Sequence, residues 1–204
     1  MTASGTIIGG LQRVLQILNF RRFQRSEDGA TAVEFSIVAT PFFMFIFALI
    51  GFSFFFFNMN SIEMGMDAAS RLIRTGQATA NSQTPLTVDQ FKQKICDGAG
   101  SWINCNNVQV FAQHWSNWVP GPNDPPLNPS DCVDSNSTVI QNSAPGSSPI
   151  ANYTGTASDI VIVTTCYKWD FASKIPFLKI GNMPDGSMMM QTATAFRSEP
   201  YPGN

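Results

Sequence analysis

One long stretch of the chain is apolar on every side of a helix. From Ala32 to Phe57 the sequence runs for 26 residues with Glu34 as its only charged residue, and ten of the seventeen phenylalanines lie in this stretch. At about 1.5 Å per residue, a helix of this length extends roughly 39 Å, which exceeds the hydrocarbon thickness of a bilayer, about 30 Å. The alternative is a buried core helix, which is usually shorter and less uniformly apolar. The stretch is therefore predicted to be a transmembrane helix, with a local kink at Pro41.

The pattern changes directly after this stretch. Apolar residues now recur at alternating spacings of three and four, which is typical of a helix with one apolar stripe: Met59, Ile62, Met66, Ala69 and Ile73. Asp67 and Arg71 lie off the stripe and are predicted to form an i,i+4 ion pair. The membrane helix is therefore expected to continue as an amphipathic stalk to about Thr75, where Gly76 can end it.

The remaining chain contains one further helix signal and three strand signals. Thr87 and Gln90 have the spacing of a capping box and predict a short helix that ends near Gly98. The strand candidates are rich in β-branched or aromatic residues and are bounded by Gly, Pro or Asn: residues 107–113, 159–171 and 187–199. This order predicts an α+β head with a small, largely antiparallel sheet.

A long connection interrupts the head. Residues 118–158 are dense in Pro, Gly, Ser and Asn, which favours an irregular surface loop that is too polar to build a core. Such a loop could equally be a recognition surface. The predicted organisation is a basic leader over 1–29, a membrane helix and stalk over 30–76, and a head over 77–204.

The flanking charges predict the orientation of the membrane helix. Four arginines precede the span, and the next basic residue after it is Arg71. The positive-inside rule therefore places the N-terminus in the cytoplasm and the head on the opposite side of a single-pass protein. A cleaved secretory signal is the alternative, but the apolar stretch is about twice as long as the usual hydrophobic region of a signal, and the nearest Ala-x-Ala, at 78–80, comes about twenty residues too late.

A cut on the cytoplasmic side of the helix fits the sequence better. Cleavage between Gly29 and Ala30 would make Glu34 the fifth residue of the mature chain. The new α-amine is a cation, and a carboxylate one helical turn further on, or in a neighbouring subunit, can neutralise it within an apolar bundle. Glycine suits the position before the cut because a peptidase must extend the chain in its cleft.

These residues carry a resemblance to a known family. The basic leader, Gly29 and the following "ATAVEF", with Glu34 fifth and Phe35 after it, resemble the processing site of type IVb (Flp) prepilins. The whole chain resembles the TadE-like family of the tight-adherence (Tad) pilus system. Three further stretches support this resemblance: "AASRLIRTGQA" (68–78), "TTCYKWDF" (164–171) and "AFRSEPY" (195–201).

The resemblance implies a structural protein rather than an enzyme. It implies a minor pilin or pseudopilin in the bacterial inner membrane, with a periplasmic head and without a cofactor. The implied partners are a prepilin peptidase that cuts after Gly29 and the other pilins and pseudopilins of the Tad system. An uncleaved, signal-anchored envelope protein that binds or adheres through its head is the alternative, and an envelope enzyme is a more distant one.

The four cysteines all follow the membrane stretch, where an oxidising compartment permits disulfides. Four cysteines allow three pairings. The favoured one joins Cys96 to Cys105, which closes a short turn, and Cys132 to Cys166, which holds the long loop to the strand at 159–171. Zinc is the competing use, but the chain has no Cys-x-x-Cys pair and a single histidine.

No residue cluster has the spacing of a catalytic site. His114 is the only histidine, and no nucleophile elbow, HExxH or phosphate-binding glycine loop accompanies it, which favours a structural or surface role.

Asp124, Asp131 and Asp134 could surround calcium, but the regular calcium-loop spacing is missing and solvated charge is the simpler reading.

The aromatic and charged residues of the exported part argue in the same direction. Trp102, Trp115 and Trp118 are expected to pack in the core or loops, although they could also serve partner binding. Without residues 1–29 the chain has eight basic and twelve acidic side chains, a net charge of −4, so nucleic acid binding is disfavoured.

Overall fold

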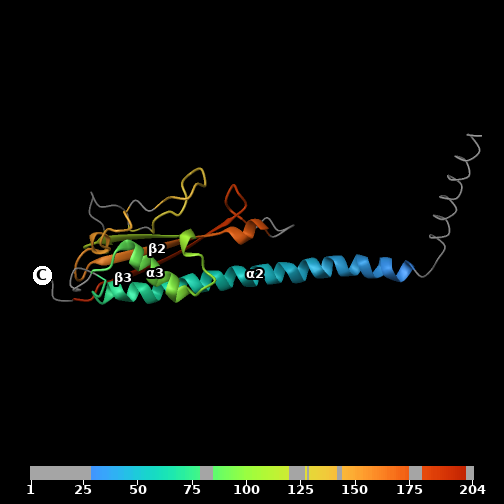
Figure 1. Ribbon diagram of the computed structural model, residues 1–204, viewed down its shortest axis with the longest axis horizontal. Helices are drawn as coiled ribbons and strands as arrows, with labels where there is room; N and C mark the ends of the chain where they lie inside the picture. Colours follow the sequence, from blue (N-terminus) through green and yellow to red (C-terminus); the bar gives the residue numbers. More distant parts are fainter. Residues whose placement is uncertain are drawn as a thin grey trace, which may run out of the picture. The chain divides into compact units, whose positions relative to one another are not determined.

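The computed structural model describes residues 29–78, 85–119, 127, 129–141, 144–174 and 181–200 (Figure 1). Its elements, in chain order, are α2 Ala30–Arg74, α3 Val88–Ala99, η2 Cys105–Asn107, β1 Val108–Trp115, α4 Ala151–Thr154, β2 Ile160–Trp169, η3 Asp170–Lys174 and β3 Met188–Arg197. The chain divides into two compact units between Ile50 and Gly51, within α2. The second unit holds the last part of α2 and the whole head.

Helix α2 follows the two predicted patterns. Its buried residues all lie from Gly51 onward, and they include most of the predicted stripe: Ile62, Met66, Ala69 and Ile73, with Met59 partly buried against the same core. The helix ends at Arg74, and Gly76 has a φ of 74°, a left-handed conformation that glycine adopts without strain. The continuous helix from membrane stretch to stalk is therefore confirmed.

The predicted pair between Asp67 and Arg71 is wrong. The ion pairs of the described residues do not include it, and the basic residue that pairs at this end of α2 is Arg74, whose Nε lies 3.8 Å from Glu199 Oε1. Exposed side chains gain little from pairing in water, so helical spacing alone does not hold two of them together.

Helix α3 begins as its sequence predicts. Thr87 Oγ1 accepts a hydrogen bond from Gln90 N at 3.2 Å, and Gln90 Oε1 accepts one from Thr87 N at 2.9 Å, so the capping box is confirmed. The buried residues of α3 include Phe91, Ile95 and Ala99, which form one face of the helix.

All three predicted strands are present and form one antiparallel sheet in the order β1-β2-β3. The register sets Val108 opposite Tyr167 at one end of β1 and Trp115 opposite Ile160 at the other. In the central strand every residue except Lys168 is buried. A strand buried on both faces requires a cover on each side of the sheet.

The two covers are different. On one face the sheet packs against α2 and α3 in a core that includes Ile62, Met66, Phe91, Ile95, Val163 and Tyr167. On the other face a smaller core contains Cys132, Cys166, Met183 and Met189, with Phe111, Val133 and Val139 packed against it. The prediction that residues 118–158 are too polar to build a core is therefore wrong in part, because Cys132 and Ile150 are each only 2% exposed.

Two disulfides hold these layers together. Cys96 is joined to Cys105 and Cys132 to Cys166, which is the pairing favoured by the sequence. The first bond ties α3 to the short turn before β1, and the second fixes the loop to the central strand. Ser130 N also donates to Thr164 Oγ1 at 3.1 Å, so the loop follows the sheet beside the second bond.

Helices α2 and α3 meet backbone to backbone. A Cβ added to Gly65 would overlap the carbonyl oxygen of Ile95 and lie 2.8 Å from the Ala99 nitrogen, and a Cβ added to Gly98 would lie 2.9 Å from the Gly65 Cα. Backbone atoms at such distances cannot rotate away as a side chain can. Glycine is therefore required at this crossing for steric reasons.

We predict that Gly65→Ala destabilises the head. At an exposed helix position, alanine is more stable than glycine by roughly 0.5–1 kcal/mol. Without the contact to α3, the substitution would therefore stabilise α2. Overpacking usually costs about 1–3 kcal/mol. At Gly65 the new methyl group meets backbone atoms of α3, so this steric cost should exceed the gain in helix propensity. Thermal unfolding of the full chain in detergent measures the outcome, with Met64→Ala, an exposed neighbour on the same helix, as the control. A Tm equal to or above that of the wild type would contradict the claim that glycine is required where α2 crosses α3.

Candidate functional site

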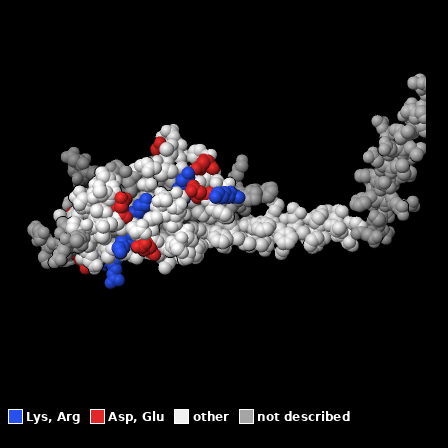
Figure 2. Space-filling model, viewed as in Figure 1, with Lys and Arg blue, Asp and Glu red and all other residues white. Residues whose placement is uncertain are grey.

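The first half of α2 has the properties of a membrane span. Among the described residues, α2 is the one helix that is both long and apolar enough to cross a bilayer, and only 6% of its most apolar window is buried. Its phenylalanines are exposed on all sides, as lipid contact requires. On the face shown in Figure 2, the charged side chains lie over the head.

Two hydroxyl groups inside this stretch bond to their own helix. Ser36 Oγ donates to the Val33 carbonyl at 2.9 Å, and Thr40 Oγ1 donates to the Ser36 carbonyl at 2.7 Å. Polar groups that are satisfied within the segment can enter hydrocarbon at low cost. The polar residues of the stretch are thus compatible with lipid.

Glu34 differs from these hydroxyl groups. Its side chain is exposed, and it has no hydrogen bond or ion pair with any residue that the structure describes. It is the fifth residue of α2, so it lies one helical turn beyond Ala30, on the same face and about 6 Å further along the axis. This carboxylate is placed to accept a partner near the start of the helix.

Gly29 directly precedes α2, and the fold does not require glycine there. A Cβ added to it would have no atom of the described chain within 4 Å. Its backbone also lies outside the left-handed region, in contrast to Gly76 and Gly100. The predicted processing residues Gly29, Ala30, Glu34 and Phe35 therefore occupy consecutive turns at an accessible helix start.

His114 does not belong to a catalytic cluster. Its Nδ1 lies 3.6 Å from Asp159 Oδ2, and the same carboxylate oxygen accepts hydrogen bonds from Thr156 N at 2.8 Å and Thr156 Oγ1 at 3.2 Å. The aspartate thus closes the turn that leads into β2, and the imidazole, which is partly exposed, lies against it. This arrangement is structural.

The structure gives the carboxylates that were considered for calcium other surroundings. Asp134 Oδ1 accepts hydrogen bonds from the backbone nitrogens of Asn136 and Thr138, both at 2.8 Å, and so stabilises its own turn. Asp131 is exposed, and Asp124 lies outside the described residues. No group of three or more potential metal ligands occurs in the described part of the chain.

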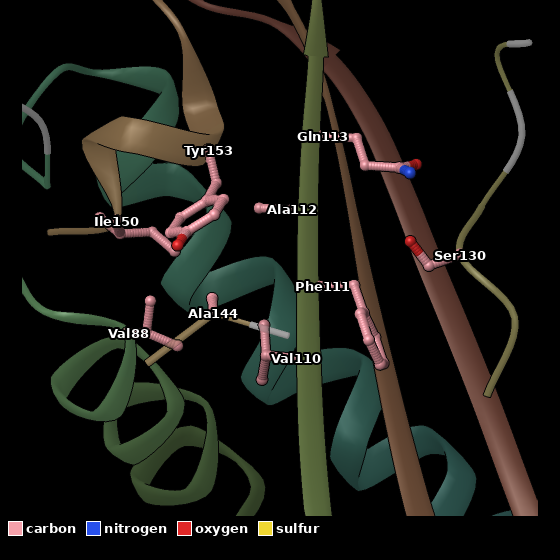
Figure 3. A pocket seen from close by; sticks show the side chains of 9 residues that line it. All are labelled: Val88, Val110, Phe111, Ala112, Gln113, Ser130, Ala144, Ile150 and Tyr153. Carbon is pink, nitrogen blue, oxygen red and sulfur yellow. The ribbon is translucent and has the colours of Figure 1, made fainter. Parts of the chain in front are cut away.

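A small cavity of about 110 Å³ lies along β1 (Figure 3). Ala144, Ile150 and Tyr153 lie on one side of the strand, and Phe111, Gln113 and Ser130 lie on the other. Ligand sites usually have volumes of about 300–1,000 Å³, so this space fits a few water molecules or one side chain rather than a substrate.

The three tryptophans considered above differ in exposure. Trp115 is buried in the head, as expected, while Trp118 is exposed. Trp102 contacts α2: its indole nitrogen donates to Ser61 Oγ at 3.2 Å, and its ring centroid lies 5.1 Å from that of Phe57. The sequence contains no signal for this contact, because more than forty residues separate Trp102 from its partners.

The structure also contains a charge cluster at the end of the sheet, which no pattern in the sequence predicted. Lys168 Nζ lies 2.6 Å from Asp185 Oδ2 and 3.6 Å from Asp170 Oδ1. Hydrogen bonds from Lys168 and then from Ser187 hold the pKa of Asp185 well below its usual range, and the Asp185 hydrogen bond raises the pKa of Lys168. The cluster therefore keeps the Asp185 carboxylate ionised.

In the described structure, one long helix whose first part is apolar enough to cross a membrane carries an α+β head. Residues 29–71 match the family model of TadE-like proteins, so the resemblance to that family is confirmed over this segment. The match begins at Gly29 and covers the membrane stretch and most of the stalk. No curated protein and no solved structure matches the chain.

Acid sensitivity provides a test of the charge cluster. Because the pKa of Asp185 is lowered in the folded chain, its carboxylate adds stability above the unfolded pKa of about 3.9, and this stability is lost as the pH falls through the lower folded value. We predict that Asp185→Asn lowers the Tm at pH 7 and that its difference from the wild type narrows below about pH 4. Glu63→Gln, which removes an exposed carboxylate of α2, is the control. A difference that is independent of pH would contradict the role of the ionised group.

Proposed function

We propose that the chain is a structural subunit of a bacterial Tad (Flp, type IVb) pilus, namely a minor pilin or pseudopilin that is needed for pilus assembly. The observation that carries this proposal is the TadE-like match, which starts at Gly29, at the first turn of a 45-residue helix. An apolar helix of this length can pack beside other pilin helices, while its head remains outside the helical bundle.

Processing by a prepilin peptidase is the first step of the proposed mechanism. The enzyme would cut between Gly29 and Ala30 and release the basic leader. The absence of any packing demand on Gly29 supports this role, because the glycine then serves an extended conformation in the peptidase cleft rather than the fold.

The second step is neutralisation of the new N-terminus. An isolated charge at the centre of a membrane costs on the order of 2.5–3.5 kcal/mol on insertion scales, and a pair of opposite charges avoids part of this cost. Glu34, one turn from Ala30, can accept the α-amine of its own chain or of a neighbouring subunit. In the second case the pair sets the axial stagger between adjacent helices.

The proposed location follows from the leader. Its arginines would remain in the cytoplasm, and the head would reach the periplasm, where the two disulfides can form. The subunit would leave the inner membrane only when it enters a pilus. Its partners would be the prepilin peptidase and the other pilins and pseudopilins of the system.

We predict that the mature protein begins with Ala-Thr-Ala-Val-Glu-Phe. N-terminal sequencing of the chain from cells with an active prepilin peptidase checks this, and cells without the peptidase provide the control. A chain that still starts at Met1 in the first cells would reject cleavage and favour the uncleaved, signal-anchored binding or adhesion protein.

Glu34→Gln tests the charge pair. The change should leave membrane insertion and cleavage intact, because glutamine is uncharged and of similar size, but it should reduce assembled pili by about tenfold or more, the effect of losing roughly 1.4 kcal/mol or more per subunit contact. Pili are quantified by shearing and immunoblotting. The matched control is Glu63→Gln on the stalk of the same helix. Pilus levels equal to those of the wild type would argue against the proposed role of Glu34.

A further inference from the structure

Five aromatic side chains gather around α2 where its all-round apolar surface ends. The ring centroid of Phe57 lies 5.1 Å from that of Trp102, and the centroid of Phe55 lies 6.4 Å from that of Trp169, which in turn is 5.9 Å from that of Phe171. We call these five residues the aromatic collar. It joins α2 to the turn after α3 and to the end of β2.

The collar is only partly covered by protein. Trp102 is 55% exposed, Phe171 52% and Phe57 48%, although each is a large apolar side chain. Trp169, at 5%, forms the buried base on which Phe171 lies. Exposed aromatic surface of this kind is expected to have an apolar partner.

The chemistry of the collar fits the boundary between lipid and water. Tryptophan is enriched at this boundary because its ring is apolar while its N–H can donate a hydrogen bond. The N–H of Trp102 donates to Ser61 Oγ, on the stalk side of Phe57. The ring therefore meets Phe57, one of the last phenylalanines of the apolar stretch, and its polar atom points toward the stalk, where buried Ser61 satisfies it.

Two carboxylates beside the collar are paired. Lys168 contacts both Asp170 and Asp185, and Asp170 Oδ2 also accepts a hydrogen bond from Asn107 Nδ2 at 2.7 Å. Carboxylates that are already bound to a cation or an amide lose less when they approach a lipid surface. This end of the sheet can therefore lie close to headgroups.

We propose that the aromatic collar is a membrane-interface site, through which the head rests on the lipid surface from which α2 emerges. The proposal depends on the membrane span of the proposed function, but not on cleavage or on pilus assembly. Its occupant is lipid at the level of the glycerol and upper acyl chains. The continuity of the collar with the apolar part of α2 favours lipid over a separate protein partner.

This contact also determines the depth of α2. With Phe55 at one interface, a hydrocarbon layer of about 30 Å corresponds to about 20 helical residues and reaches Phe35 at the other. Glu34 and Ala30 then lie in the opposite interface rather than in the hydrocarbon. At the interface, the pair between Glu34 and the α-amine of Ala30 would cost little free energy. The pair would stabilise the assembly when helices of neighbouring subunits pack against one another.

Fluorescence quenching in vesicles tests the collar. The full chain is reconstituted in phosphatidylcholine and phosphatidylglycerol vesicles that contain lipids brominated either near the headgroup end or near the terminal end of the acyl chain. Tryptophan fluorescence should be quenched more strongly by bromine near the headgroup end than by bromine near the terminal end. We call the loss of fluorescence caused by the headgroup-end bromine the shallow-quenched amplitude. Trp102→Phe should reduce the shallow-quenched amplitude by roughly half or more, since Trp102 is the exposed indole of the collar.

Trp118→Phe is the matched control. Trp118 is 56% exposed, but it follows Trp115, which pairs with Ile160 at the far end of β2 from Trp169. Nine steps of strand at about 3.3 Å each put this end of β2 roughly 30 Å from Trp169. Removal of Trp118 should leave the shallow-quenched amplitude unchanged.

A gain-of-signal variant covers the case in which Trp102→Phe disturbs the head. Phe171→Trp keeps an aromatic ring in the collar and should increase the shallow-quenched amplitude. Flotation of the vesicles with bound protein reports insertion of α2 separately from these signals. An inserted chain in which neither Trp102→Phe nor Phe171→Trp changes the quenching would overturn the proposal. Quenching of Trp102 by aqueous iodide that stops only when a second pilin is added would also overturn it, in favour of a protein partner.

Discussion

The head of this protein depends on a steric constraint, the backbone contact between α2 and α3 at Gly65 and Gly98. Because neither residue has a side chain, the two helices approach closely enough to form one layer under the sheet. The stripe of α2 and the buried face of α3 then share a single core with the inner face of β2. A wider crossing would leave part of that core open to water, and a chain with so small a core has little stability to lose.

The same helix serves two environments. Up to Phe54 most of its large apolar side chains are exposed, and the hydroxyl groups of Ser36 and Thr40 bond within the helix, which suits lipid. Beyond Asn58 only one stripe is apolar, and this stripe is covered by the head. The change falls at the aromatic collar. The exposed apolar part of this helix can therefore enter a membrane, while its last part, from Phe55 onward, packs against the head.

The second face of the sheet shows how a small head compensates for limited apolar surface. Part of its cover, including Cys132, comes from the polar segment 129–141, which is held by the Cys132–Cys166 bond and by hydrogen bonds to the strands, and Met183 adds to it. Disulfides of this kind typically contribute about 2–4 kcal/mol. The polar clusters of the head also have structural partners: Asp134 stabilises a turn, Asp159 stabilises another, and Lys168 joins two carboxylates. Each of these charged groups therefore helps to hold its own part of the head in place.

Local patterns determined much of this protein. The length and uniformity of the apolar stretch, the spacing of the stripe, the capping box of α3, the three strands and the cysteine pairing are all readable from the sequence, because each depends on residues close together in the chain or on a small set of possible partners. So is the position of Glu34 relative to Gly29, which defines the candidate processing site. Only the tertiary structure decided which polar segment covers the sheet, why Gly65 must be glycine, and that Trp102 and Phe171 meet the end of the apolar helix. These features arise between residues tens of positions apart, and their geometry depends on how closely two backbones approach, which no local pattern encodes.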